Sequence, residues 1–302
     1  MKWVVGIDGG GSRASAVVLD EDGNEAARTT GGSGIVEAPR IGQVSDRLAA
    51  LVRTVLEQAG QVPPCDAAVF ALAGAGREPQ RSQVEERLAA AGVARVVAVV
   101  TDAEAAFHDA LGEEPGILLI AGTGSIAWGR GGDGAEARTG GWGMRIGDEG
   151  SGYAIAIAGL RAVVRAIDGR DPETALTDGL LLEPGLNDPS ALVRWADSAP
   201  KKEIAALAPI VLRVAESDPT ALRIVEDAVD QLVRHVVTLE EKLRPWPDGA
   251  PVALAGGLVE SAAPFRARLE TAIADRVPGA RVLDDVVDAA RGAARLALRR
   301  LD

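Results

Sequence analysis

Two glycine-rich turns in the chain have the residue types and spacing needed to bind phosphate. Glycine has no Cβ, so successive backbone N–H groups can approach phosphate oxygens, and a serine hydroxyl at the end of each turn adds a donor. The aspartate that begins the first turn can hold Mg²⁺ through water, because Mg²⁺ prefers oxygen ligands and keeps much of its hydration. We predict two phosphate loops, and a purely structural turn is the alternative for each. The loops are Asp8-Gly9-Gly10-Gly11-Ser12 and Gly122-Thr123-Gly124-Ser125.

The surroundings of these turns are repeated in the chain. Residues 4–32 and 117–141 each read as an apolar strand, a Gly-rich turn, a second strand, a polar Asp-Gly turn and a third strand. A P-loop or a dinucleotide fingerprint requires a helix directly after the glycines, so neither motif fits. The first copy has Asp8 where the second has Ala121. The repeat therefore indicates one scaffold used twice, with different roles in the two halves.

Asp102 is a candidate general base. It lies between an apolar strand and a predicted helix, in the run Thr101-Asp102-Ala103-Glu104. A carboxylate at the carboxyl end of a strand can accept a proton from an attacking hydroxyl. Thr101 or Asp102 is equally suited to cap the helix that follows. The local sequence leaves both interpretations open.

Two further glycine-rich segments are candidates for ligand contacts. Residues 140–152 contain Trp142 and Asp148 among many glycines, which is more typical of a ligand-binding loop than of a plain connection. A flexible, solvated loop is the alternative. Gly256-Gly257 follows an apolar strand and would let a flat ring lie against bare backbone, unless it is a simple strand-to-helix turn.

Hydrophobic periodicity predicts the elements that position these residues. Each half begins with three strands in meander, followed by alternating helices and strands, which is typical of an α/β layer architecture. The second half carries a helical insertion between residues 153 and 243. We predict two related domains, residues 1–112 and 113–287, with the C-terminal helix at about 288–302 packing back on the first. The expected elements are strands at 2–8, 14–20, 25–30, 67–73, 95–100, 251–255 and 280–283, and helices after Gly42 and at 80–91, 220–243, 264–274 and 287–300.

The composition excludes several classes of protein. A net charge of −12 argues against nucleic-acid binding, although backbone N–H groups still allow an anionic nucleotide. Cys65 is the only cysteine, so the chain has no intrachain disulfide and no cysteine-based zinc cage. The sequence shows neither a signal peptide nor an apolar run of about 18 residues. We expect a cytoplasmic protein that uses neither membrane nor nucleic acid.

The ordered set of motifs resembles the actin-like sugar-kinase superfamily of ATPases. Within it, the chain is most similar to the N-acetylglucosamine and glucosamine kinase group of the BadF/BadG/BcrA/BcrD-type ATPases, a family that also includes activator ATPases of CoA-ester dehydratases and reductases. The resemblance extends from Lys2 to about Ala294. It is strongest in VVGIDGGGS, AGTGSIAWG and GGWGMRIGDEGSGY.

This resemblance implies duplicated ribonuclease-H-like domains flanking a nucleotide cleft, and transfer of phosphate from ATP to the 6-hydroxyl of glucosamine or N-acetylglucosamine. Asp102 would be the base, and Asp8 would position Mg²⁺ and its water. Both glycine-rich turns would hold phosphates, and Gly256 and Gly257 would lie against the adenosine. The implied sugar contacts are Ser33, Asp102, Gly141, Trp142, Gly143 and Asp148.

The resemblance also implies a homodimer. It leaves open which hexose is phosphorylated, because the loop Gly31–Ile35 and Thr101 lack the asparagines that are common in the family. An activator-type ATPase is disfavoured, since an iron–sulfur cluster shared by two subunits needs two cysteines from each. A non-catalytic sugar or nucleotide sensor is the remaining alternative.

Overall fold

A computed structural model describes residues 1–11, 13–186 and 188–301. Ser12, to which a phosphate contact is assigned above, lies outside the described residues. The chain divides into two compact units. Unit 1 comprises Met1–Glu114 and Asp285–Asp302, and unit 2 comprises Pro115–Asp284.

Unit 1 contains a five-stranded sheet in the order β3-β2-β1-β4-β5. The first three strands are antiparallel neighbours, whereas β1, β4 and β5 run parallel. Val4, Val5 and Ile7 of β1 are fully buried, as a central strand covered on both faces requires. The strands are β1 (Trp3–Gly9), β2 (Ala14–Asp20), β3 (Glu25–Gly31), β4 (Cys65–Leu72) and β5 (Ala94–Val100).

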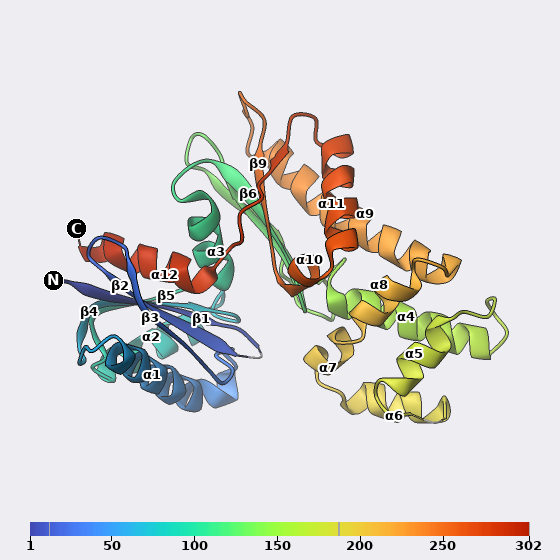
Figure 1. The fold of residues 1–302 in the computed structure, drawn as a ribbon, viewed down its shortest axis with the longest axis horizontal. Helices are drawn as coiled ribbons and strands as arrows, with labels where there is room; N and C mark the ends of the chain where they lie inside the picture. Colours follow the sequence, from blue (N-terminus) through green and yellow to red (C-terminus); the bar gives the residue numbers. More distant parts are fainter. Residues whose placement is uncertain (12, 187, 302) are drawn as a thin grey trace. The chain divides into compact units, whose positions relative to one another are not determined.

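Helices cover both faces of this sheet (Figure 1). α1 and α2 lie on one face, and α3 and α12 lie on the other. The C-terminal helix approaches β1 closely because Gly6 has no side chain: a Cβ there would stand 2.1 Å from the backbone nitrogen of Ala294. The helices are α1 (Ile41–Gln58), α2 (Gln80–Ala90), α3 (Asp102–Leu111) and α12 (Ala289–Leu298), with short 3-10 turns at Ala38–Arg40 and Arg299–Leu301.

Unit 2 repeats the sheet in the order β10-β9-β6-β7-β8. Here too the first three strands in the chain are antiparallel, and the last two pair in parallel. β6 thus occupies the position of β1, and β9 that of β4. The strands are β6 (Gly116–Ala121), β7 (Ser125–Arg130), β8 (Glu136–Gly140), β9 (Pro251–Ala255) and β10 (Arg281–Val282). The matching topologies confirm the duplicated α/β fold.

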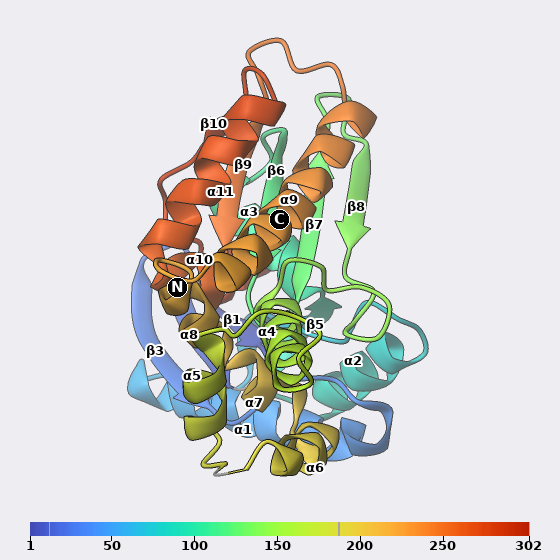
Figure 2. The ribbon, with the colours of Figure 1, turned by 90° about the vertical axis from the view of Figure 1, so that its right-hand side faces the viewer.

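The long helix α9 crosses the sheet of unit 2 beside α11 (Figure 2). Its amphipathic face buries residues such as Val225, Leu232 and Leu239 in the core of the unit. The predicted helical insertion comprises α4 to α9, in which α5, α7, α8 and α9 pack against α4. The helices are α4 (Gly152–Ile167), α5 (Leu176–Leu182), α6 (Ser190–Ser198), α7 (Lys201–Ala205), α8 (Ala208–Val214), α9 (Pro219–Lys242), α10 (Gly257–Ser261) and α11 (Ala263–Arg276). Among the described residues, no helix is long and apolar enough to span a membrane.

Candidate active site

The first glycine-rich loop begins where β1 ends. Asp8 and Gly9 are the last residues of β1, and Gly10 donates its N–H to the carbonyl of Arg13 at 3.1 Å. A Cβ on Gly9 would stand 2.5 Å from Cδ2 of Leu72 and 3.1 Å from the carbonyl oxygen of Gly34. Only glycine therefore fits at the start of this loop without displacing its neighbours.

The loop Gly31–Ile35 packs directly on the first glycine-rich loop. The Ser33 hydroxyl and the Gly34 N–H both donate to the carbonyl of Gly10, at 3.2 and 3.1 Å. Ser33 thus braces a candidate phosphate loop in this structure. Its predicted contact with sugar stays a prediction.

Asp8 lies at the carboxyl end of β1, and Asp102 comes two residues after the end of β5. Both strands run parallel to β4, so both carboxylates lie at the same edge of the sheet. Thr101 is the N-cap of α3, and its hydroxyl accepts the N–H of Glu104 at 3.2 Å. Asp102 is partly buried, and its Oδ1 accepts the N–H of Ala103 at 3.0 Å. With Thr101 as the cap, the Asp102 carboxylate does not have to serve that purpose.

Burial raises the pKa of Asp102 above its usual value. The pKa of Asp8 is raised to about 6, first by burial and then by the negative charges of Asp102 and Asp288, while the charge of Arg13 acts in the opposite direction. The negative charges of Asp102 and Asp288 that raise the pKa of Asp8 would favour a cation beside its carboxylate.

The donor set around Asp8 fits a hydrated magnesium ion. Among the described residues, no three His, Cys, Asp or Glu side chains gather where they could enclose a metal. Mg²⁺ in phosphoryl-transfer sites is usually held by one or two carboxylates together with water and substrate phosphates. Asp8 can supply such a carboxylate.

The second glycine-rich loop is tied to the segment that follows β8. Within the loop, Gly122 donates its N–H to the carbonyl of Gly124 at 2.9 Å, and the carbonyl of Gly122 accepts the N–H of Gly152 at 2.9 Å. The Ser125 hydroxyl donates to the carbonyl of Glu149 at 2.6 Å. These bonds join the predicted phosphate loop to the predicted sugar loop inside unit 2.

Gly256 and Gly257 lie beside the second loop. Gly256 has φ 99°, and a Cβ there would stand 2.6 Å from the carbonyl oxygen of Ala121. A Cβ on Gly122 would be 3.6 Å from the nitrogen of Gly257. A largely apolar pocket of about 250 Å³ is lined by residues of α8, α10 and α11, among them Leu212, Leu258 and Phe265. The glycine pair thus lies next to the second glycine-rich loop, and Leu258, the residue that follows the pair, lines this pocket.

Asp148 is fixed within the predicted sugar loop. Among the described residues, Asp148 is the one non-glycine residue with a positive φ, 61°. Such a conformation is kept where surrounding contacts impose it. Its Oδ1 accepts the N–H of Ser125 at 3.3 Å, and its Oδ2 accepts from Nζ of Lys201 at 2.7 Å. Trp142 is 56% exposed, and the guanidinium of Arg138 lies 4.8 Å from the centre of its ring. Trp142 is therefore available for stacking, whereas Asp148 already has protein partners.

Comparison with known proteins agrees with this arrangement. The model of the BadF/BadG/BcrA/BcrD ATPase family matches residues 5–297. The chain belongs to this family. It is 32% identical to an N-acetylmuramic acid/N-acetylglucosamine kinase of Clostridium acetobutylicum, over 86% of this chain and 87% of the relative. It is 30% identical to an N-acetyl-D-glucosamine kinase of Dictyostelium discoideum, over 97% of both chains.

The chain is also similar to a solved structure in its three-dimensional fold. The structure of a presumed N-acetylglucosamine kinase from Chromobacterium violaceum superposes with a TM-score of 0.83 and 27% sequence identity, covering 98% of this chain and 99% of the other. The fold of this chain is thus shared with a solved structure over nearly its whole length.

The family motifs do not include three residues that the structure places near the site. Lys201 contacts Asp148, Asp288 acts on the pKa of Asp8, and His235 lies 4.0 Å from Glu149 through its Nε2. The Nε2 of His235 and the Oε2 of Glu149 are buried without a hydrogen-bond partner among the described residues, and burial lowers the pKa of His235. No sequence signal near these three residues indicates their neighbours, because each lies on an element far along the chain.

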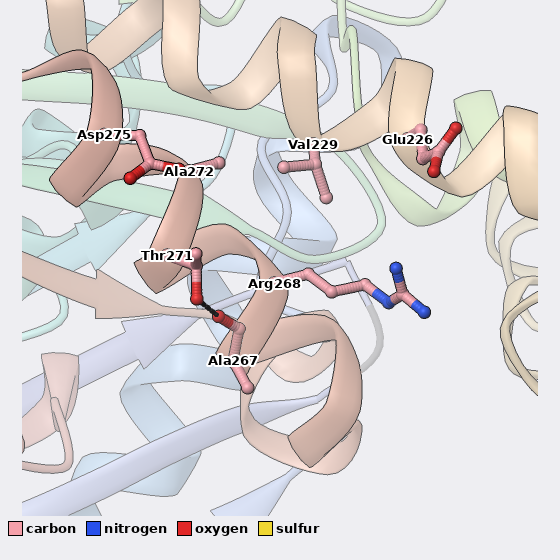
Figure 3. A pocket seen from close by; sticks show the side chains of 7 residues that line it. All are labelled: Glu226, Val229, Ala267, Arg268, Thr271, Ala272 and Asp275. Atoms are coloured by element: carbon pink, nitrogen blue, oxygen red, sulfur yellow. Dashed lines mark hydrogen bonds between the residues drawn. The ribbon is translucent and has the colours of Figure 1, made fainter.

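A further pocket of unit 2 is separate from the family motifs. It lies between α9 and α11 and has a volume of about 410 Å³ (Figure 3). Its apolar floor includes Val229 and Ala272, and Glu226, Arg268 and Asp275 stand around it. None of the predicted site residues lines it.

Gly124→Ala is expected to lower kcat/KM for ATP by about 10- to 100-fold, because small misplacements of positioning groups are costly. The new Cβ would stand 2.7 Å from Oδ1 of Asp148 and 2.9 Å from Nζ of Lys201, so this ion pair must move. Steady-state kinetics measures the effect. Gly132→Ala is the matched control, since nothing lies within 4 Å of a Cβ there. Equal kinetics for the two variants would contradict a role for the second loop.

Proposed function

We propose that the protein is an ATP-dependent kinase that phosphorylates the 6-hydroxyl of an amino sugar, either glucosamine or N-acetylglucosamine. The observation that carries this proposal is the pair of Asp102 and Asp8, two carboxylates of raised pKa at the carboxyl ends of parallel strands of one sheet. Membership of an ATPase family and the likeness to amino-sugar kinases support it.

Asp102 accepts the proton of the sugar hydroxyl as that oxygen attacks the γ-phosphate. Its raised pKa makes it a better proton acceptor than an exposed aspartate, provided that it is ionised at the working pH. Such a base contributes roughly 10²–10⁴ in rate. Thr101 leaves the carboxylate available by capping α3 itself.

The glycine-rich loops supply backbone N–H groups to the phosphates of ATP. We assign this role to the loops formed by Gly9, Gly10, Gly11 and Ser12 and by Gly122, Thr123, Gly124 and Ser125. The N–H groups of Gly10, Gly122 and Ser125 already donate to Arg13, Gly124 and Asp148. The backbone donors that we propose for phosphate are therefore those of the other residues in each loop. Asp8 would hold hydrated Mg²⁺, and the ion would neutralise charge on the transferred phosphate. Gly256 and Gly257 lie against the adenosine, and the pocket beside Leu258 is the candidate site for its base.

Sugar recognition is assigned to the loop after β8. Gly141 and Gly143 both have positive φ, 71° and 86°, so the chain turns sharply on either side of Trp142. This leaves the indole exposed for a sugar ring, and Asp148 and Ser33 add polar groups. Because Asp148 already bonds with Ser125 and Lys201, it would bind a hydroxyl through a remaining lone pair.

The state of Cys65 disfavours an activator ATPase that carries an iron–sulfur cluster. Cys65 is buried in the core of unit 1, and burial raises its pKa to about 12. Cluster ligands are thiolates, so this thiol is unsuited to that role. A homodimer and a cytoplasmic location stay predictions from the sequence.

Coupled ADP release tests the proposal. We expect turnover with glucosamine or N-acetylglucosamine to exceed that with glucose or mannose by at least about tenfold in kcat/KM, with little ATP hydrolysis in the absence of sugar. The product should be the 6-phosphate, identified by phosphorus NMR. Sugar-independent ATP hydrolysis by a protein that also binds iron would contradict the proposed function.

A further inference from the structure

A lysine far from the glycine motifs in sequence lies directly over the second loop. Nζ of Lys201 and the carboxylate of Asp148 occupy the space above the bare Cα of Gly124, where a Cβ would stand 2.9 Å from the lysine nitrogen. Lys201 begins α7, which packs against α4. The Gly122 carbonyl is bonded to Gly152, the first residue of α4. The same packing that fixes the loop therefore fixes the ammonium group.

The ion pair is asymmetric in its exposure. The Asp148 side chain is 5% exposed, whereas that of Lys201 is 31% exposed. Among the described residues, Asp148 is the one hydrogen-bond partner of the Lys201 ammonium. An ammonium group has three N–H donors, so donors are left for another anion. The carboxylate holds the ammonium in place over the loop and leaves one side of it accessible.

The chemistry of this position favours a phosphate. A lysine ammonium is a compact charge that serves as a phosphate ligand where glycine backbone supplies the other donors. The chain as a whole carries a net charge of −12, so local positive charge strengthens binding of a tetra-anionic polyphosphate beyond what backbone N–H groups supply. An ammonium placed over the Gly122–Ser125 turn supplies it.

We propose that Lys201 contacts the phosphates of ATP at the second glycine-rich loop, with Asp148 as the residue that positions it. This inference rests on the proposed function only in taking ATP as the ligand. It adds a residue that none of the motifs contains. It also gives the strained backbone of Asp148 a reason, since that conformation directs the carboxylate at both Ser125 and Lys201.

The experiment compares adenosine with its phosphorylated forms, so that the ligands differ only in their phosphates. Isothermal titration of the full chain with ATP, ADP and adenosine, without sugar, is done for the unaltered protein, Lys201→Met and Lys202→Met. We expect Lys201→Met to weaken ATP and ADP by about 10- to 100-fold, the range for a hydrogen bond to a charged group, and adenosine by less than about twofold. Lys202, the exposed neighbour on α7, is the matched control and should change none of the three.

Lys201→Arg keeps the charge, and we expect it to retain tighter ATP binding than Lys201→Met. If loss of the ion pair prevents Lys201→Met from folding, Lys201→Gln replaces it in the comparison, because the amide N–H can still donate to Asp148 without the positive charge. Equal weakening of the binding of ATP, ADP and adenosine, or a change in sugar affinity alone, would show that Lys201 acts only through Asp148. Either result would overturn the proposal. ATP binding without turnover of any amino sugar would refute the proposed substrate and leave the Lys201 comparison valid. Absence of ATP binding by the unaltered protein would overturn both.

Discussion

Asp102→Asn is expected to lower kcat by at least ~100-fold, because general-base catalysis by a positioned carboxylate contributes roughly 10²–10⁴ in rate. Asparagine has nearly the same shape and cannot take the proton. Its Oδ1 can still accept the N–H of Ala103, and the Thr101 cap of α3 does not change. We therefore expect a folded variant whose dissociation constant for ATP stays within about twofold of the original.

Single-turnover kinetics with saturating ATP and sugar measures this loss at the chemical step. Glu104→Gln is the matched control. Glu104 is in the same first turn of α3, and its substitution removes the same charge from the helix end. We expect its kcat to stay within about threefold, because a helix-end charge is worth only about 0.3–1 kcal/mol. If Asp102→Asn turned over like the unaltered protein, Asp102 would not be the base.

The sequence predicted the fold because its signals are local. The duplicated strand pattern, the hydrophobic periodicity and the turn residues gave the strands and main helices within a few residues, and strand 251–255 is confirmed at the same bounds. The helix caps are also local. Ser151 directly precedes α4, and its hydroxyl accepts the N–H of Ala154 at 3.2 Å.

Contacts between distant elements could not be predicted in this way. The position of Lys201 over Gly124 depends on how α7 packs on α4, and the effect of Asp288 on Asp8 depends on how α12 packs on β1. The sequence suggested only a sugar contact for Asp148, whereas its two oxygens bond to groups 23 and 53 residues away. Tertiary packing sets these distances, and no period or motif in one sequence reports them.

Asp8→Asn is expected to act in opposite directions on activity and on stability. Loss of the carboxylate should lower kcat by about 100-fold or more, because a catalytic metal contributes several kcal/mol and each 1.36 kcal/mol corresponds to a factor of ten. The same substitution should stabilise the protein at pH 8 by roughly 1–3 kcal/mol, since one pKa unit corresponds to 1.36 kcal/mol. The reason is that burial and the charges of Asp102 and Asp288 oppose ionisation of Asp8 in the folded state.

The sign follows from two pKa values, about 6 for Asp8 in the folded protein and 3.8 for an unperturbed aspartate. The folded state binds the proton more tightly, so ionisation of Asp8 reduces the free energy of unfolding as pH rises from 3.8 to about 6. Above that range the full cost is present, and below it the cost vanishes. Urea unfolding at pH 8 and pH 5 should therefore show a larger gain for Asp8→Asn at pH 8. The exposed Asp22→Asn is the control, with a change within about 0.5 kcal/mol.

Magnesium should reverse this cost in the unaltered protein. A cation at Asp8 favours the ionised carboxylate, so Mg²⁺ with ADP should stabilise the unaltered protein at pH 8 more than ADP alone does, by RT ln(1 + [L]/Kd). The Asn variant should gain little from the added Mg²⁺. The acid limb of kcat/KM, expected near pH 6 from the pKa of Asp8, should move to lower pH as Mg²⁺ is raised. Equal stabilisation of both proteins by Mg²⁺ would place the metal away from Asp8, because the Asn variant lacks the carboxylate that is expected to hold the cation. The unfavourable ionisation of Asp8 would then have no compensating cation.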